Sequence, residues 1–449
     1  MTRRNPLWRF LALLFALALV AAACGDDDDG GDEGATDTTE APEGDEESEG
    51  GGELAGMKGT TPLIELSDDF KNRLLEVNSE LSDFNYAAES YDAAIVIALA
   101  TLAAGSDGIE LASEINQVTR GGEKCEDFAS CAEIIAGGNK DIDYDGVSGP
   151  LEFSGNGEPT VASYGILTFG DDNRIDDDAT EYREAQAPAE ADVEQVPVEG
   201  SRAGDGTLKI GTLLPETGSL AFLGPPEFAG VDLAIAEINE NGGVLGKNVE
   251  VSHGDSGDTS TDIANQTVDR LLSENVDAII GAASSGVTAT VIDKITSAGV
   301  VQFSPANTAK SLSTYADKGL YFRNAPSDIL QGAVLGEVIA EDGHTTVAIL
   351  ALDDPYGTGL AEDLQAALEE SGVEVVNSII YDPQAQTFDS EVGEIAGDDP
   401  EAIVIIGFDE SSRILATMVE QGIGPRDKAV YGVDGNMGNA LGENFDAGQ

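Results

Sequence analysis

The sequence predicts an α/β protein made of two doubly wound lobes with parallel sheets, joined by a hinge. The chain has 449 residues, more than one hydrophobic core usually organises. From Leu208 onward, short apolar runs alternate with amphipathic stretches of roughly 10–15 residues, which is the pattern of parallel strands covered by helices on both faces. The alternation occurs in two series, so we expect one lobe over residues 205–326 and a second over residues 327–449.

The chain begins with a segment typical of export. Arginines at positions 3, 4 and 9 precede an apolar run over 10–20 that is short for a membrane span. The run leads into three alanines and Cys24, which resembles a bacterial lipobox, where the cysteine is lipidated and becomes the mature N-terminus. We therefore expect a lipoprotein signal peptide over 1–24. The alternative is an ordinary signal peptide with an incidental cysteine.

Residues 25–53 contain 14 acidic residues, no Lys or Arg, and very few apolar residues. Such a segment cannot bury enough surface to fold, so we expect a disordered acidic tether. The whole chain carries a formal net charge of −63, and most of this acidity lies beyond the tether. It argues against nucleic acid and anionic membrane surfaces as partners, and it is compatible with a salty habitat.

The segment 54–174 is rich in helices and poor in strands. Its spacing of apolar residues predicts helices over 70–77, 90–104, 109–118 and 128–135, and strands over 149–153 and 162–169. The second of these helices contains AIVIALATLAA and must be largely buried because it is apolar all round. Residues 175–204 lack periodicity and are rich in Asp, Glu, Ala and Pro, so we expect a linker there.

Two cysteines, Cys125 and Cys131, lie six positions apart in a chain that we expect to be exported. A local disulfide is therefore predicted. A metal site at these cysteines is not expected, because neither His253 nor His344 is near them in sequence and the spacing is not CxxC.

Residues 141–152, DIDYDGVSGPLE, fit the spacing of a calcium-binding EF-hand loop, with acids at loop positions 1, 3, 5 and 12 and glycine at 6. However, Gly149-Pro150 interrupts the loop, and a strand pattern continues where a helix would be required. We expect a turn into a strand and no metal, with calcium as the alternative.

The two lobes can be followed element by element. In the first lobe we expect strands over 208–214, 249–253, 277–281, 300–303 and 320–322, and helices over 228–239, over 263–272 and from 287. In the second lobe we expect helices over 329–339, 359–370 and 411–421, and strands over 346–351, 373–381, 402–407 and 429–432. No helix is predicted after the last strand, so the second lobe looks unfinished and 54–174 looks like the missing part.

Polar turns follow two neighbouring strands of the first lobe. Ser284 and Ser285 follow the strand at 277–281, and SPANTA at 304–309 follows the next strand. In open α/β sheets ligands bind outside the carboxyl ends of the strands. The helix that starts near 287 would also offer free N–H groups to an anion. We therefore predict the floor of a binding site here.

Five further stretches carry a family resemblance: TLKIGTLLPETGSLAFLGPPEFAGVDLAIAEINENGGVLGKNVEV, IIGAASSGVTATV, SPANTA, DDPYGTGLAEDLQ and YGVDGN. They resemble periplasmic binding proteins of fold type I, in the Leu/Ile/Val-binding group that serves ABC importers. YDAAIVIALA, the cysteine pair and DYDGVSGPLEF resemble the end of family members but come first here. The resemblance implies a circular permutation, in which 54–174 is the family's C-terminal third and completes both lobes, and 175–204 joins the old ends.

The resemblance also implies an amino-acid ligand clasped between the lobes, with roles assigned by position. Ser285 corresponds to the hydroxyl that receives the ligand carboxylate, and Ala306 to the carbonyl that meets the ammonium. Thr308 corresponds to a contact of both charged groups. Tyr356 corresponds to a closing aromatic residue of the second lobe, and Asp434 to the acid that pairs with the ammonium.

Two ligand-site positions depart from the family pattern, because Phe408 replaces a tyrosine and Leu223 stands where another aromatic residue often occurs. Because of these two departures, the resemblance does not define which side chain the ligand carries. The proposed contacts are chemically sensible, since a carboxylate needs donors and an ammonium needs acceptors. The alternative for Ser285 and Thr308 is ordinary helix capping.

An enzyme is not expected, and neither is a cofactor. Ala282-Ala283-Ser284-Ser285-Gly286 lacks the first glycine of a nucleophile elbow, and no phosphate-binding or dinucleotide fingerprint occurs. The resemblance implies a lipid-anchored solute-binding protein on the extracytoplasmic face of the membrane, which delivers a small amino acid to an ABC permease. The alternatives are a sensing receptor without transport, or a rearranged copy that no longer binds. The identity of the solute and the oligomeric state stay open.

Overall fold

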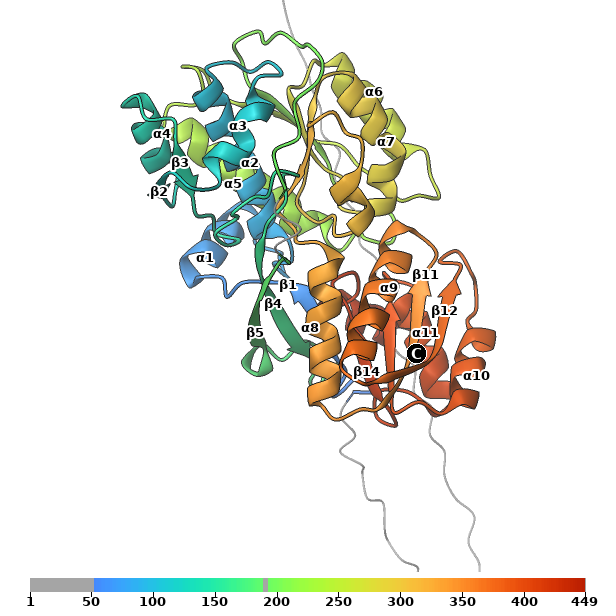
Figure 1. Cartoon of the computed structure of the whole chain (residues 1–449). Helices are drawn as coiled ribbons and strands as arrows, with labels where there is room; N and C mark the ends of the chain where they lie inside the picture. Colours follow the sequence, from blue (N-terminus) through green and yellow to red (C-terminus); the bar gives the residue numbers. More distant parts are fainter. Residues whose placement is uncertain (1–51, 189–192, 449) are drawn as a thin grey trace, which may run out of the picture. The chain divides into compact units, whose positions relative to one another are not determined.

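The computed structural model describes residues 52–188 and 193–448. The predicted signal peptide, Cys24 and nearly all of the predicted tether lie outside the described residues. Within the described residues the chain forms two α/β lobes, each organised around its own sheet (Figure 1). This confirms the predicted fold class.

The first lobe has a five-stranded parallel sheet with the strand order β10-β9-β8-β6-β7. Its strands are β6 (Lys209–Leu213), β7 (Glu250–Ser252), β8 (Ala278–Gly281), β9 (Val301–Ser304) and β10 (Tyr321–Arg323). Its helices are α1 (Asp68–Val77), α2 (Ala87–Ala104), α3 (Leu111–Val118), α4 (Phe128–Ala136), α5 (Gly224–Glu240), α6 (Ile263–Ser273) and α7 (Ser285–Ser297). Strands β8 and β9 are buried throughout, which explains why they are apolar without alternation.

The second lobe has a seven-stranded mixed sheet with the order β12-β11-β13-β14-β1-β4-β5. The strands are β1 (Lys58–Pro62), β4 (Val161–Thr168), β5 (Glu181–Gln186), β11 (Thr346–Leu352), β12 (Glu374–Tyr381), β13 (Ala402–Ile406) and β14 (Ala429–Gly432). The helices are α8 (Asp328–Glu341), α9 (Pro355–Glu370), α10 (Asp389–Asp398), α11 (Ser411–Glu420) and α12 (Asn439–Gly448). The first five strands in this order run parallel, and β4 and β5 are antiparallel to their neighbours.

The early part of the chain contributes to both lobes and does not form a separate globule. Strand β1 lies between β14, to which it is parallel, and β4, to which it is antiparallel. Lys58 is the Cα partner of Tyr431 on one side and of Thr168 on the other. The second sheet is therefore continuous only because residues from the two ends of the described chain pair with each other.

In the first lobe, helix α2 connects the early part of the chain to the later part. It packs against α5 so closely that a Cβ at Gly230 would lie 2.2 Å from the carbonyl oxygen of Ala87, which explains the glycine. Among the described helices, α2 is long and apolar enough to cross a membrane, but nearly all of its residues are buried in the lobe. Its composition is therefore that of a core helix.

Three expectations about elements need correction. The expected linker contains β5, an edge strand whose half-exposed residues lack apolar alternation, so periodicity could not reveal it. Residues 149–153 form isolated bridges and no strand, because Leu151 and Glu152 have φ of 58° and 45°. A helix, α12, does follow the last strand of the second lobe.

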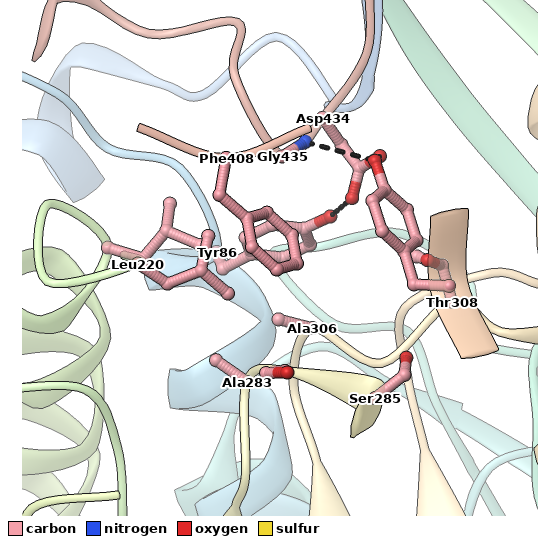
Figure 2. Close-up of a pocket in the computed structure, with 12 residues that line it drawn as sticks. Tyr86, Leu220, Ala283, Ser285, Ala306, Thr308, Phe408, Asp434 and Gly435 are labelled. Atoms are coloured by element: carbon pink, nitrogen blue, oxygen red, sulfur yellow. Dashed lines mark hydrogen bonds between the residues drawn. The ribbon is translucent and has the colours of Figure 1, made fainter. Parts of the chain in front are cut away.

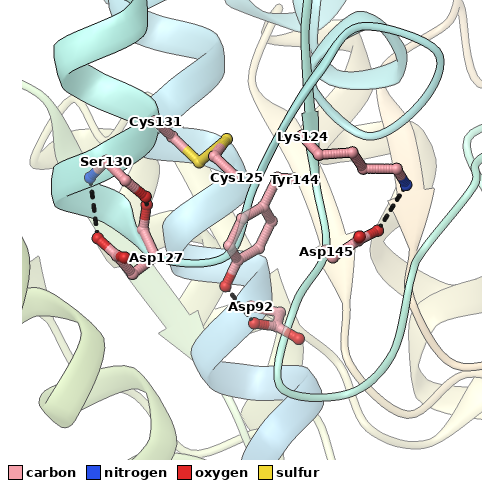
Figure 3. Close-up of a disulfide and its surroundings, with 8 residues drawn as sticks. All are labelled: Asp92, Lys124, Cys125, Asp127, Ser130, Cys131, Tyr144 and Asp145. Atoms are coloured by element: carbon pink, nitrogen blue, oxygen red, sulfur yellow. Dashed lines mark hydrogen bonds and ion pairs between the residues drawn. A yellow bond between two sulfur atoms is a disulfide. The ribbon is translucent and has the colours of Figure 1, made fainter.

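A small two-stranded sheet of β2 (Glu123–Cys125) and β3 (Ile142–Tyr144) carries the cysteine pair. The sulfur atoms of Cys125 and Cys131 are bonded at 2.07 Å, and Cys131 lies on α4 (Figure 3). The disulfide therefore joins the end of β2 to the first turns of α4.

The loop that resembles an EF-hand is occupied by a lysine side chain. The Lys124 ammonium lies 2.9 Å from Asp143 and 3.5 Å from Glu152. It also lies 2.8 Å from Asp145, and this contact is drawn in Figure 3. Three of the four acids that would coordinate calcium, all except Asp141, therefore share the lysine ammonium. Among the described residues, no cluster of three or more His, Cys, Asp or Glu side chains could hold a metal ion.

Candidate ligand-binding site

A small cavity lies between the carboxyl ends of the two sheets. The cavity is narrow, because the ≈ 270 Å³ of space between its lining residues includes solvent at its open side. The residues that line it are Tyr86, Leu220, Leu223, Ala283, Ser284, Ser285, Ala306, Thr308, Tyr356, Phe408, Asp434 and Gly435. Figure 2 shows Ala283, Ser285 and Ala306 on one side of the cavity and Phe408 and Asp434 on the other.

The start of α7 supplies one part of the cavity floor. Ser284 caps the helix, because its hydroxyl accepts a hydrogen bond of 3.3 Å from the backbone N–H of Val287. Ser285 is the first helical residue, and its hydroxyl oxygen accepts from the N–H of Ala309 at 3.3 Å. The residue that caps α7 is therefore Ser284 and not Ser285, for which capping was the alternative, and the Ser285 hydroxyl keeps its own proton for another acceptor.

The turn after β9 supplies the other part of the floor. The Ser304 hydroxyl donates to the Ala282 carbonyl at 2.7 Å and accepts from the N–H of Asn307 at 2.9 Å. The Asn307 side chain donates to the Ala283 carbonyl at 2.7 Å, so the turns after β8 and β9 are joined. Within the described residues the Ala306 carbonyl has no hydrogen-bond partner, and it belongs to the cavity lining. The turn is thus rigid and still offers one free acceptor.

Asp434 faces this floor from the second lobe. It follows β14, is 4% exposed, and accepts hydrogen bonds from the hydroxyl groups of Tyr86 at 2.8 Å and Tyr356 at 2.7 Å. Burial raises the pKa of the Asp434 carboxyl, and the tyrosine hydrogen bonds act in the opposite direction. Asn436 holds the same loop, since its side chain accepts from Val433 and donates to the Ile405 carbonyl.

A second buried acid, Asp328, lies at the first turn of α8 behind the floor. Its backbone N–H donates to the Thr308 carbonyl at 2.8 Å. Burial and the nearby Asp434 raise the pKa of Asp328 well above its ordinary value. A raised pKa favours the neutral form of an acid, so the two carboxyl groups do not both carry a full negative charge beside the cavity.

Apolar side chains complete the cavity. The rings of Tyr356 and Phe408 stack with centroids 5.6 Å apart and planes 10° apart. Leu220 and Leu223, from the loop before α5 and its cap, line the first-lobe side. The phenylalanine at 408 leaves this wall without a hydroxyl, so the wall suits an apolar group.

The structure brings all seven residues that the sequence assigned to the ligand into this one cavity: Leu223, Ser285, Ala306, Thr308, Tyr356, Phe408 and Asp434. Sequence reasoning missed Tyr86, Leu220, Ala283 and Gly435 as lining residues. Tyr86 precedes a helix that is apolar all round, and its φ of 59° turns it out of that helix, a conformation that no sequence pattern indicated. Leu220 lies three residues before Leu223 in the same family-like stretch, so extending the family correspondence from Leu223 would have found it.

The chain is similar in sequence to known proteins. Residues 207–448, more than half of the chain, match a family model described as "Periplasmic binding protein". A leucine-, isoleucine-, valine-, threonine- and alanine-binding protein of Pseudomonas aeruginosa is 32% identical over 171 residues, 38% of this chain and 45% of that protein. A chemotactic signal transduction system substrate-binding protein of Halobacterium salinarum is 30% identical over 212 residues, 45% of this chain and 50% of that protein.

The chain is also similar to solved structures. The substrate-binding protein of a branched-chain amino acid transporter from Streptococcus pneumoniae, solved with isoleucine, is 30% identical and has a TM-score of 0.47. The match covers 54% of this chain and 68% of that protein. The chain spans about half the length of the two curated relatives described above. By its family match over residues 207–448, this chain belongs to the periplasmic binding proteins.

Proposed function

We propose that this protein binds a small α-amino acid with an apolar side chain between its two lobes. The observation that carries the proposal is the opposition of Asp434 on one lobe to the Ser285 hydroxyl and the α7 N-terminus on the other. The ligand carboxylate would receive hydrogen bonds from Ser285, Thr308 and the helix N–H groups. Its ammonium would meet Asp434 and the Ala306 carbonyl, and its side chain would lie against Phe408 and Leu223.

A thermal-shift screen of the purified protein with the common amino acids tests this proposal. An amino acid at 100 times its Kd should stabilise the fold by about 2.7 kcal/mol. For L-leucine, two matched analogues separate the charged groups: isocaproate lacks the ammonium, and isoamylamine lacks the carboxylate. Both should bind more weakly than leucine. Equal binding of either analogue, or no stabilisation by any amino acid, would reject the proposal, the latter in favour of a rearranged copy without binding activity.

We further propose that the protein is lipid-anchored through Cys24 on the extracytoplasmic face and delivers its solute to an ABC permease. Hinge closure around the ligand would present the closed form to the permease. Sensing without transport is the second candidate, and the chemotactic relative from Halobacterium salinarum favours considering it. Uptake of radiolabelled ligand by cells with and without this gene distinguishes the two, because only a transport component changes uptake.

We also propose that the chain is a circular permutation of the family fold. The proposed segments are 25–53 as tether, 54–174 as the family's C-terminal part, 175–204 as the join, 205–326 as lobe I and 327–449 as lobe II. The family match at 207–448 and the pairing of β1 with β14 support this arrangement. A variant in which 205–449 precedes 54–174 should keep the circular dichroism spectrum and the ligand affinity. An unfolded variant would count against permutation, and size-exclusion chromatography of both forms would reveal a domain-swapped dimer.

A further inference from the structure

Arg323, at the end of β10, has a fully buried side chain. Its guanidinium contacts the turn that follows β9, residues 306–309, which we call the ligand turn. Its side chain is 1% exposed. The Nη1 atom donates to two carbonyl groups, those of Asn307 at 3.1 Å and Ala309 at 3.0 Å. These two residues flank Thr308, a residue of the cavity lining. One nitrogen atom of Arg323 therefore holds both neighbours of a proposed ligand contact.

The same guanidinium also contacts the hinge. Its Nε and Nη2 atoms donate to Glu158 Oε2 at 2.9 and 2.6 Å. Glu158 lies between Phe153, in the core of the first lobe, and β4, in the second sheet, so it belongs to a segment that crosses between the lobes. The chain crosses again directly after Arg323, between β10 and α8. The ion pair therefore joins two crossing segments to the ligand turn.

The backbone of Thr308 itself makes no hydrogen bond to the first lobe within the part of the chain that the structure describes. The Thr308 carbonyl accepts from Asp328 at the start of α8, on the second-lobe side of the crossing. The Ala309 N–H is bound by Ser285. The Asn307 and Ala309 carbonyls point to Arg323, whereas Ala306 and Thr308 belong to the cavity lining, with the Thr308 side chain hydrogen-bonded to the Asp328 carboxyl.

We infer that Arg323 is a positioning residue for ligand binding, which fixes the 306–309 turn and couples it to the hinge through Glu158. The inference rests on the proposed function, because it assumes that Ala306 and Thr308 contact the ligand. It depends on the planar fork of arginine. A lysine can keep the charge next to Glu158 but cannot reach the carboxylate and two carbonyl groups together.

Arg323→Lys tests the inference by titration calorimetry with L-leucine, or with the amino acid that stabilises the wild type most. We expect a loss of affinity of about tenfold or more in a protein that still melts cooperatively. Ser313→Ala is the matched control, because the Ser313 hydroxyl contacts both Arg323 and Glu158 but not the turn. It should leave the affinity within about twofold of the wild type.

A double-mutant cycle separates positioning from general stability. Arg323→Lys should be strongly non-additive with Thr308→Ala and additive with Tyr356→Phe, whose hydroxyl contacts Asp434 on the other lobe. Unchanged affinity in Arg323→Lys, or additivity with Thr308→Ala, would overturn the inference. If Arg323→Lys does not fold, Glu158→Gln takes its place in the same cycle with the same expectations. Failure of the wild type to bind any amino acid would instead reject the proposed function.

Discussion

The hydroxyl group of Tyr86 donates a hydrogen bond of 2.8 Å to the carboxylate of Asp434, although 348 positions separate the two residues. Tyr86 precedes α2 in the first lobe, and Asp434 follows β14 in the second. The side chain of Asn85 adds a second hydrogen bond between the lobes, which it donates to the Met437 carbonyl at 3.1 Å. The two lobes are therefore joined through the acid that is proposed to hold the ligand ammonium.

Removing the Tyr86 hydroxyl should weaken the contact that holds the two lobes together. We expect Tyr86→Phe without ligand to show a larger radius of gyration in small-angle scattering than the wild type, because a buried interlobe hydrogen bond is lost. Tyr356→Phe is the matched control, since it removes the other tyrosine hydrogen bond to Asp434 from within the second lobe. Identical scattering of all three proteins would contradict this role for Tyr86.

Replacing the acid itself should affect affinity most. Asp434→Asn should weaken binding of a zwitterionic ligand by about 1.5–3 kcal/mol, because a charge-assisted contact is removed. Ser285→Ala should cost less, since backbone N–H groups at the start of α7 still receive the carboxylate. Calorimetric titration of both variants measures the difference. Unchanged affinity in Asp434→Asn would mean that the ligand carries no ammonium at this position.

Glu89 should make stability depend on pH. Burial raises its pKa to about 8, and the nearby Asp92 adds to the effect. A carboxyl whose pKa is raised on folding stabilises the folded protein fully at pH values below its pKa in the unfolded chain. For Glu89 this contribution is lost as the pH rises through the folded pKa of about 8. Glu89→Gln should therefore stabilise the protein at pH 8.5, on the order of 2–4 kcal/mol, and have little effect at pH 4.5.

Denaturant unfolding at the two pH values measures this difference. The exposed Glu80→Gln is the control and should change stability equally at both. A Glu89→Gln variant that is no more stable than the wild type at pH 8.5 would show that this carboxyl ionises in the folded protein without cost.

The cysteine pair should be oxidised in the exported protein. Thiol labelling of the unfolded, unreduced protein, mapped by peptide analysis, should find neither Cys125 nor Cys131 reactive. Because the closed loop is short, Cys131→Ser should lower the free energy of unfolding by about 2 kcal/mol. Two labelled cysteines at these positions would disprove the bond.

Cys24→Ser should release the protein from membranes. The physical reason is that the acyl chains on this cysteine would be the sole anchor of an acidic chain that anionic lipids repel. Fractionation of cells expressing the wild type and the variant measures the effect. Equal recovery of both in the membrane fraction would place the anchor elsewhere.

Much of the architecture follows from the sequence because the information is local. The apolar runs of β8, β9 and β13 report burial on both faces, and the serines after β8 mark the carboxyl end of a strand. The turn SPANTA was predicted as part of the site because it follows a predicted strand. The acid in YGVDGN was assigned only through the resemblance to a known family. Periodicity and this resemblance together therefore predicted most of the cavity lining.

The tertiary structure alone decided which distant groups meet. Tyr86 reaches Asp434 only because β1 pairs with β14 and α2 packs on α5. Arg323 meets Glu158 across 165 positions, and β5 exists only because β4 offers it an edge. Amphipathic patterns indicate whether a side chain is buried, but not which residues it packs against. Contacts between residues far apart in the chain depend on how the elements pack, so the hinge pair and the interlobe hydrogen bond emerge only in the folded molecule.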